Sequence, residues 1–289
     1  MSGRTVFDAV MRAWYRGQAP ASPSVERYTR PSLATFAKIR RAGRPALLGG
    51  LLDDWPRRDA LTLAALRARF ADRRLPVLAT AAGRLVGDAA TGVAFDTMRF
   101  GDYLDRLTAG ERLDAYLASP LDAWLPELHA DMPPPIYCRD VPWRNARLWI
   151  SSPGTVVPLH RDVAQNIFIQ LAGRKRFLLY PPAASPWLYS NGFRSALPNY
   201  SRFDPDRPDY DVFPLSRTPR PVEVVLEPGD AMYLPSRWWH RVRSLEVSLS
   251  VNFWWADGAL ALAVRAAEFV KRRRSLEIYG LEQRLRAHA

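Results

Sequence analysis

The sequence is poor in cysteine and contains no long apolar run. Cys138 is the only cysteine among 289 residues, so the chain cannot form an internal disulfide, and a zinc site built from cysteines is excluded. No stretch approaches the ~20 apolar residues that span a bilayer, and no apolar signal-peptide core follows Met1-Ser2-Gly3-Arg4. We therefore expect a cytoplasmic protein without a membrane partner.

Lysine is also scarce, although the chain is strongly basic. Only three of its 41 basic residues are lysines, so 38 arginines dominate the formal net charge of +12. A basic balance favours nucleic-acid or acidic partners. The arginines are spread along the chain, which is equally consistent with a G+C-rich coding background, and the one dense run, residues 271–274, is typical of a solvated helix face. RNA stays open as a partner.

The main chemical motif lies between Gly154 and Pro182, in GTVVPLHRDVAQNIFIQLAGRKRFLLYPP. Its His160 and Asp162 stand two positions apart, and because side chains alternate along a strand, both leave the same face of an extended segment. His240, in YLPSRWWH, offers another imidazole further along the chain. Two histidines and one carboxylate, with the remaining coordination positions open, are the ligand set of a non-haem Fe(II) oxygenase.

An H-x-D pair alone is weak support for a metal site, because two common residue types at this spacing arise by chance in many chains. A hydrogen-bonded core histidine is the alternative interpretation of His160. His129, in PELHADM, could add a ligand or contact a substrate, but an exposed histidine at a helix end is favoured.

The sequence around the motif alternates as strands do. Residues 165–171 and 175–180 flank an Ala-Gly turn and predict a hairpin, in which Lys175 shares a face with Phe177 and Leu179. A lysine in an apolar setting is costly unless it meets an anion, either a carboxylate of the protein or one of a small dicarboxylate. The alternative is a lysine on the solvent face of the hairpin, where lysines usually lie.

Eight short runs with Gly or Pro punctuation predict a mainly β fold, the double-stranded β-helix or jelly roll of the cupins. In the last run Ser248, Ser250 and Asn252 share one face, which should therefore look into a wet cavity. The runs are 146–150, 156–160, 165–171, 175–180, 222–226, 231–234, 240–245 and 247–255.

We accordingly divide the chain into an N-terminal helical and mixed segment (1–144), a jelly-roll core (145–257) and C-terminal helices (258–289). Helices are predicted before the core at 5–15, 32–41, 63–70 and 100–107.

Two stretches interrupt the regular pattern. Residues 120–145 hold six prolines, too many for regular structure. Residues 186–221 combine prolines with seven aromatic residues, which predicts an ordered insertion in the core. This insertion either covers the barrel mouth and shapes the substrate site or only packs its own rings.

The motif above, together with E-P-G-D-A-M-Y-L-P-S-R-W-W-H and S-V-N-F-W, resembles the JmjC and cupin-like Fe(II)/2-oxoglutarate oxygenases, particularly asparaginyl hydroxylases of the type of factor inhibiting hypoxia-inducible factor. The resemblance is strongest over residues 145–257 and looser over 40–144. It implies that His160, Asp162 and His240 bind Fe(II).

The resemblance also implies a pocket for the cosubstrate. The distal carboxylate of 2-oxoglutarate would meet Lys175, with Asn166 and Asn252 lining the same cavity and Trp254 packing near the metal. Dioxygen would be the third reactant.

Two positions depart from the family pattern. Val157 stands where members often carry a threonine that helps to hold the distal carboxylate, so one hydroxyl is missing. The family also uses a tyrosine from the segment before the barrel, for which Tyr116 is the first candidate and Tyr137 the second.

By this resemblance, we expect hydroxylation of a C–H bond in a peptide or protein side chain or in an amino-acid-like small molecule, with succinate and carbon dioxide as co-products. Two alternatives stay open: an oxygenase of the same superfamily that modifies RNA, and a non-redox cupin such as an isomerase or a metal-dependent binding protein. Histone demethylation is less expected, because the sequence shows no reader domain. In related oxygenases C-terminal helices often form a dimer interface, so a homodimer is also possible.

Overall fold

The computed structural model describes residues 24–88, 92–192, 195–262 and 264–266. The helix predicted at 5–15, the basic run at 271–274 and most of the C-terminal segment lie outside the described residues. None of the helices that it describes combines the length and apolar character needed to cross a membrane.

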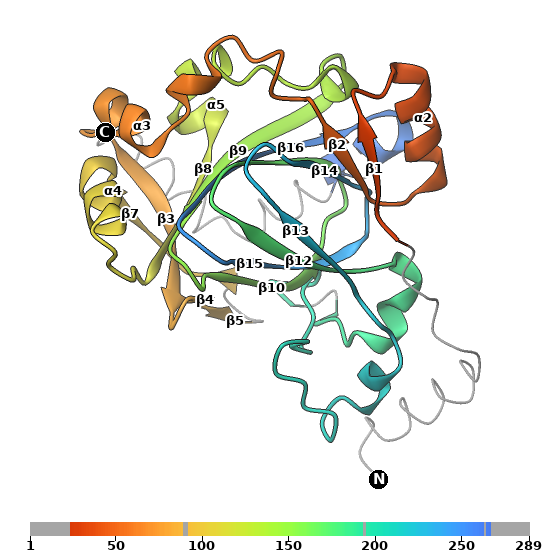
Figure 1. Cartoon of the computed structure of the whole chain (residues 1–289). Helices are drawn as coiled ribbons and strands as arrows, with labels where there is room; N and C mark the ends of the chain where they lie inside the picture. The colour runs from red at the N-terminus through yellow and green to blue at the C-terminus, as the bar shows by residue number, and fades with distance from the viewer. Residues whose placement is uncertain (1–23, 89–91, 193–194, 263, 267–289) are drawn as a thin grey trace.

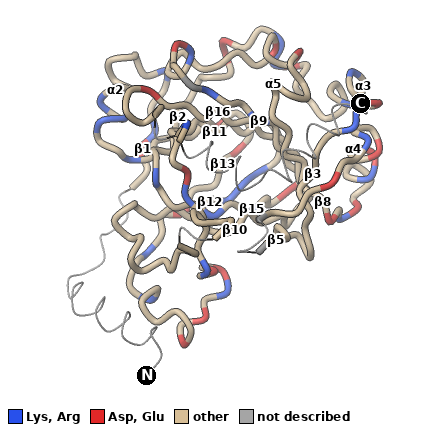
Figure 2. The backbone as a smooth tube through the Cα atoms, turned by 180° about the vertical axis from the view of Figure 1, so that it is seen from behind, with Lys and Arg blue, Asp and Glu red and all other residues tan. Residues whose placement is uncertain are grey.

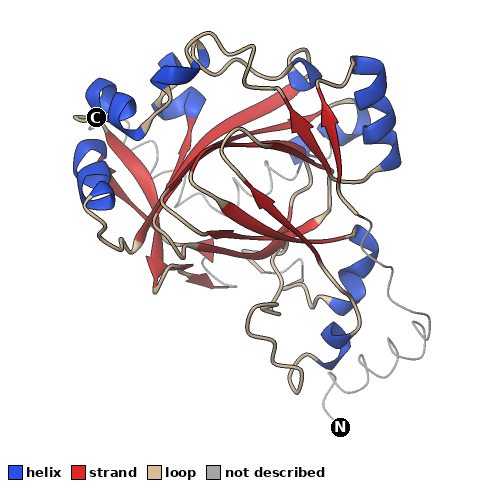
Figure 3. Ribbon diagram, in the orientation of Figure 1, coloured by secondary structure: helices blue, strands red, loops and turns tan. Residues whose placement is uncertain are grey.

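Two facing layers of antiparallel strands form the centre of the molecule (Figure 1, Figure 3). One layer has the order β14-β11-β16-β9 and the other β10-β15-β12-β13, which is the predicted double-stranded β-helix. All eight predicted runs form strands: β9 (Trp143–Ser151), β10 (Val156–Arg161), β11 (Gln165–Ala172), β12 (Lys175–Tyr180), β13 (Val222–Leu226), β14 (Ala231–Leu234), β15 (Trp239–Ser244) and β16 (Ser248–Ala256).

Strands from the N-terminal segment extend the barrel into one continuous sheet path. β2 pairs with β14 at one edge, and β8 pairs with β9 at the other, so β8 brings its side chains beside the barrel. These strands are β1 (Glu26–Thr29), β2 (Ala46–Gly49), β3 (Arg74–Ala81), β4 (Arg84–Leu85), β7 (Phe95–Arg99) and β8 (Ala115–Pro120), with a separate pair, β5 (Gly87–Asp88) and β6 (Gly92–Val93).

Helices cover the outer face of the first layer (Figure 3). Ser32 and Thr62 cap two of them by accepting from the backbone N–H three residues on, as the sequence predicts for Thr62. Phe36, Leu66 and Phe100 are buried against the sheet. The helices are α2 (Leu33–Ala42), α3 (Leu63–Phe70), α4 (Phe100–Thr108) and α5 (Leu121–Trp124).

The expectation that residues 120–145 lack regular structure is wrong in part. The stretch contains α5, the 3₁₀ turns η2 (Pro126–His129) and η3 (Ile136–Cys138), and the start of β9. Pro126 opens its turn, at a position where the missing N–H has no hydrogen bond to make. Prolines here begin short turns instead of excluding them.

β16 separates the helix-covered core from the barrel interior. Leu249, Val251, Phe253 and Trp255 are fully buried in the core beneath the helices. The alternating residues, from Ser248 to Trp254, face inward, as the predicted polar row requires. Apolar side chains fill the opposite part of the interior: Phe168, Phe177, Leu179, Met232 and Leu234.

The insertion at 186–221 packs on the outer face of the second layer. Phe203 and Leu188 share a buried cluster with Tyr180 and Trp239 of the barrel. Ion pairs add a second attachment: Asp204 and Asp206 face arginines of β4, β12 and β15, namely Arg84, Arg176, Arg241 and Arg243. The insertion also contains two 3₁₀ turns, η4 (Pro182–Trp187), which begins just before it, and η5 (Pro214–Arg217).

Candidate metal centre

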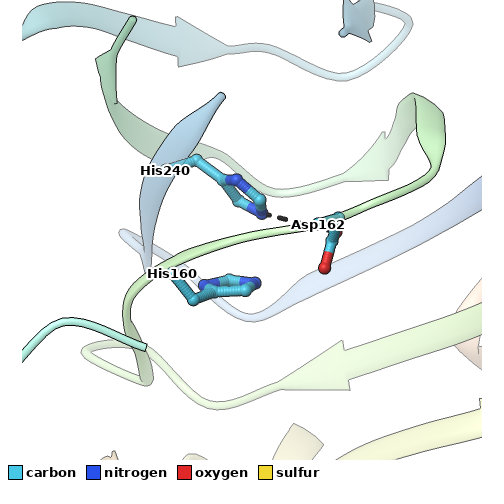
Figure 4. Close-up of side chains that lie close together, drawn as sticks. All are labelled: His160, Asp162 and His240. Atoms are coloured by element: carbon cyan, nitrogen blue, oxygen red, sulfur yellow. Dashed lines mark ion pairs between the residues drawn. The ribbon is translucent and has the colours of Figure 1, made fainter. Parts of the chain in front are cut away.

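His160, Asp162 and His240 converge inside the barrel (Figure 4). His160 lies near the end of β10, Asp162 just beyond it, and His240 directly opposite His160 on β15. One ligand atom from each side chain lies within 4.8 Å of the others. His240 Nε2 is 3.8 Å from Asp162 Oδ2, and the imidazole centroids are 4.1 Å apart. The structure thus brings the three predicted ligands together.

Backbone carbonyls orient both imidazoles. His160 Nδ1 lies 2.8 Å from the carbonyl oxygen of Pro158, and His240 Nδ1 lies 3.1 Å from that of Trp238. Each Nδ1–H therefore donates outward, which leaves the Nε2 lone pair to face the centre. Burial, reinforced by the neighbouring His160, lowers the pKa of His240 to about 4, so this ring is neutral, as a metal ligand must be.

Trp254 holds the carboxylate of the group. Its Nε1 donates to Asp162 Oδ2 at 2.9 Å, which restricts the rotation of that side chain. The Asp162 side chain stays 23% exposed, whereas that of His240 is 6% exposed, so the centre is open on the carboxylate side. Trp254 thus lies beside the carboxylate of the candidate metal centre.

Tyr200 contacts the centre from the insertion. Its ring stacks on His160 with centroids 5.0 Å apart and an angle of 16° between the planes. The flanking backbone runs along β10, where Arg161 N donates to Asn199 O and Ser201 N donates to Leu159 O. No local pattern in the sequence indicates this contact, because it depends on how a long insertion returns to the barrel.

Lys175 lies deeper in the barrel and is fully buried. Its Nζ is 2.8 Å from Ser250 Oγ and 3.4 Å from the Tyr116 hydroxyl, and it lies 5.3 Å from the Phe168 ring centroid. Burial lowers the pKa of Lys175 to about 7. Among the described residues no carboxylate forms an ion pair with this lysine; its ammonium group contacts two hydroxyls and the rings of Tyr116 and Phe168.

The two tyrosine candidates lie in different places. Tyr116 is buried beside Lys175 and stacks on Trp149 at 5.3 Å between centroids. Burial raises its pKa well above the usual value, so the phenol keeps its proton and can donate. Tyr137 stacks instead on Phe36 in the helix-covered core and donates to a backbone carbonyl there.

A chain of side-chain amides lies between the lysine and metal levels of the interior. Trp149 Nε1 donates to Asn252 Oδ1 at 2.7 Å, and Asn252 Nδ2 donates to Asn166 Oδ1 at 3.0 Å. The two predicted asparagines therefore meet, and Trp149 joins them. Its alternation with the buried Leu148 and Ile150 is a sequence signal that could have identified it.

Val157 belongs to the apolar part of the interior and packs against the cluster around Phe168 and Phe177. The hydroxyl missing here has a counterpart on the facing layer, where Ser250 contacts Lys175. His129 is not in the ligand group; it pairs with Asp122 at 2.6 Å at the end of its turn.

Comparison with known proteins places these features in a family. A cupin-like domain model matches residues 32–259. The chain is 32% identical over 243 residues to Jumonji C domain-containing protein 5 of Drosophila melanogaster, covering 78% of this chain and 58% of the relative. It is 33% identical over 224 residues to Lysine-specific demethylase JMJ30 of Arabidopsis thaliana, covering 75% and 51%.

A further match is tRNA wybutosine-synthesizing protein 5 of Mus musculus, 36% identical over 130 residues, which cover 45% of this chain and 40% of that protein. The chain spans about half the length of the curated relatives that it matches. The matched domain, the β-helix core and the His-Asp-His group agree with one another. The chain therefore belongs to the cupin-like, JmjC-containing family of Fe(II)- and 2-oxoglutarate-dependent oxygenases.

Proposed function

We propose that this protein hydroxylates a C–H bond of a protein side chain or of an amino-acid-like small molecule, with Fe(II), 2-oxoglutarate and dioxygen. One observation carries the proposal: a His-Asp-His group and a fully buried lysine lie at two levels of the same barrel interior. The His-Asp-His level fits a metal ion, and the lysine level fits the distal carboxylate of 2-oxoglutarate.

The residues of the first level fit Fe(II). Two imidazoles with inward Nε2 atoms and one carboxylate form the donor set, and the remaining coordination positions stay available for other ligands. When bound, iron, 2-oxoglutarate and dioxygen supply the oxidising chemistry, with succinate and carbon dioxide as co-products. Trp254 keeps the Asp162 carboxylate in place.

The residues of the second level fit the distal carboxylate of 2-oxoglutarate. Lys175 supplies the positive charge, and the hydroxyls of Ser250 and Tyr116 can donate to the same carboxylate. Desolvation makes an isolated buried cation costly, so a bound anion offsets that cost. Asn166 and Asn252 lie between the two levels, where they can orient the rest of the molecule.

The test is turnover of 2-oxoglutarate by the purified protein with Fe(II) and ascorbate. Succinate should form slowly without a substrate and faster once one is supplied. His160→Ala and Asp162→Ala should abolish iron-dependent turnover while circular dichroism stays unchanged. Tyr137→Phe is a matched control outside the site. Full activity in both ligand variants would refute the metal centre.

RNA is the second candidate substrate, supported by the net charge of +12 and by the similarity to a protein named for tRNA wybutosine synthesis. Figure 2 shows basic and acidic residues interleaved around the described chain. A nucleic-acid interface predicts RNA binding that weakens steeply with salt. Absence of succinate formation, despite bound metal, would instead favour a non-redox cupin.

A further inference from the structure

Arg147 lies on the inward face of β9, where no step proposed above uses it. It pairs in register with Asn252, while its neighbours Ala146 and Leu148 are buried in the helix-covered core. The guanidinium Cζ is 5.4 Å from the Trp149 ring centroid and 5.6 Å from that of Trp254. The cation thus contacts two indole rings inside the barrel.

Arg147 and Lys175 occupy different depths. Along β16 the successive inward residues contact different partners: Ser250 contacts Lys175, and Trp254 donates to the metal ligand Asp162. Arg147 pairs with Asn252 and contacts both Trp149 and Trp254, so its charge lies between Lys175 and the metal ligands. A cation at this position does not serve the distal end of a cosubstrate held by Lys175, and it is placed to meet the substrate instead.

We propose that Arg147 binds a carboxylate of the substrate, so that the hydroxylated molecule is an acidic amino-acid-like compound or an acidic residue of a peptide. This inference rests on the proposed oxygenase function. A guanidinium presents parallel N–H donors that match the two oxygens of a carboxylate.

The same charge disfavours a cationic substrate. Several of the relatives carry names of lysine-specific demethylases, and a methylated lysine is positively charged. Close to the candidate metal ligands of this chain, such a group would meet Arg147, and like charges in a partly buried site repel. The inference therefore separates this chain's substrate from a methyl-lysine.

Tryptophan fluorescence tests the inference without turnover, because Trp149 and Trp254 flank Arg147. The full chain is first saturated with Mn(II), in place of iron, and with 2-oxoglutarate. It is then titrated with capped glutamate, free glutamate, capped glutamine, capped trimethyllysine and AMP. Glutamate probes should bind at least about tenfold more tightly than capped glutamine, which is the effect of a charged hydrogen bond. The capped and free forms distinguish a peptide residue from a free amino acid.

Arg147→Met should remove this preference without weakening Mn(II) and 2-oxoglutarate binding, and Arg147→Lys should retain part of it. Arg144→Met is the control and should behave as wild type, because Arg144 is an exposed residue near the start of the same strand that donates to backbone carbonyls outside the barrel. Equal or absent binding of acid and amide by the Mn(II)- and 2-oxoglutarate-loaded protein overturns the inference alone. Tighter binding of AMP through Arg147 overturns it in favour of a nucleotide. Failure to bind Mn(II) and 2-oxoglutarate overturns the proposed function itself.

Discussion

The Tyr200 ring lies nearly parallel to the imidazole of His160, although the two residues belong to different parts of the chain. His160 is part of the barrel, whereas Tyr200 is brought to it by the insertion. A side chain outside the ligand group thus limits the movement of one ligand. The insertion packs its own rings together and places one ring against the candidate centre; that it covers the barrel mouth and shapes a substrate site stays a prediction.

Tyr200→Ala should weaken metal binding by about 10-fold or more, because partners that orient a ligand typically contribute 10–100-fold in affinity. Tyr200→Phe keeps the stacked ring and should bind Mn(II) nearly as wild type does. Titration followed by electron paramagnetic resonance of free Mn(II) measures both. Equal affinity of the Ala and wild-type proteins would show that the stacking does not position His160.

Asp206→Asn should weaken the attachment of the insertion to the barrel, because Asp206 forms ion pairs with Arg176 and Arg241. The Arg241 side chain is only 2% exposed. Removing one partner of a buried ion pair costs about 3 kcal/mol of folding free energy. We expect a lower denaturation midpoint and, through Tyr200, weaker Mn(II) binding. Asp209→Asn, in an exposed part of the insertion, is the control. Unchanged stability of the Asp206 variant would mean that the ion pairs do not hold the insertion.

Lys175 should make stability depend on pH. Burial lowers the pKa of Lys175 to about 7 in the folded protein, whereas an unfolded lysine titrates near ~10.4. Between these values the unfolded chain binds more protons, so stability rises with pH through this window, by at most about 1.4 kcal/mol per pH unit. Below the folded pKa the cost of burying the charge is fully present. Lys175→Met should remove this dependence and stabilise the protein at neutral pH, measured by urea denaturation at pH 6.5 and 9.5. If the free energy of unfolding changed equally with pH in the wild-type and Lys175→Met proteins, Lys175 would not be the source of the pH dependence.

Ser250→Ala removes the hydroxyl nearest to Lys175. The affinity for 2-oxoglutarate should fall about tenfold, as expected for one hydrogen bond to a charged group. Calorimetric titration of the Mn(II)-loaded protein gives the dissociation constant. Ser248→Ala changes a hydroxyl that contacts other serines and is the control. An unchanged dissociation constant in the Ser250 variant would show that the distal carboxylate of 2-oxoglutarate does not contact Ser250.

Val157→Thr restores the hydroxyl that the family often carries. We expect tighter 2-oxoglutarate binding, by about threefold to tenfold for one additional hydrogen bond. The unliganded protein should lose about 1 kcal/mol of stability, because a hydroxyl enters an apolar cluster. Calorimetry and urea denaturation separate the two effects. Weaker binding by the Thr variant would show that Val157 does not face the cosubstrate.

The barrel strands and several helices follow from local sequence patterns, because alternation and capping residues act over a few positions. The H-x-D spacing similarly places His160 and Asp162 on one face, and the polar row of β16 predicts which side of that strand looks inward. The alternation of residues along a strand predicts which face of the strand a side chain occupies, but it does not predict which strand faces it across the barrel. The contacts of Arg147 with Trp254 and of Lys175 with Tyr116 therefore required the structure.

The short turns in residues 120–145 escaped prediction for another reason. Proline excludes a long helix, yet it suits the first position of a turn, so its frequency alone does not distinguish loops from turns.

The alternating faces of β16 also constrain how this protein can change. Inserting or deleting one residue between Ser250 and Trp254 would exchange the two faces at one end of the strand. Indole and amide side chains would then point into the helix-covered core, and apolar side chains would point into the barrel interior. Both folding and chemistry would fail together. New substrate preferences can therefore arise in this strand by exchanging side chains, but not by altering its length by a single position.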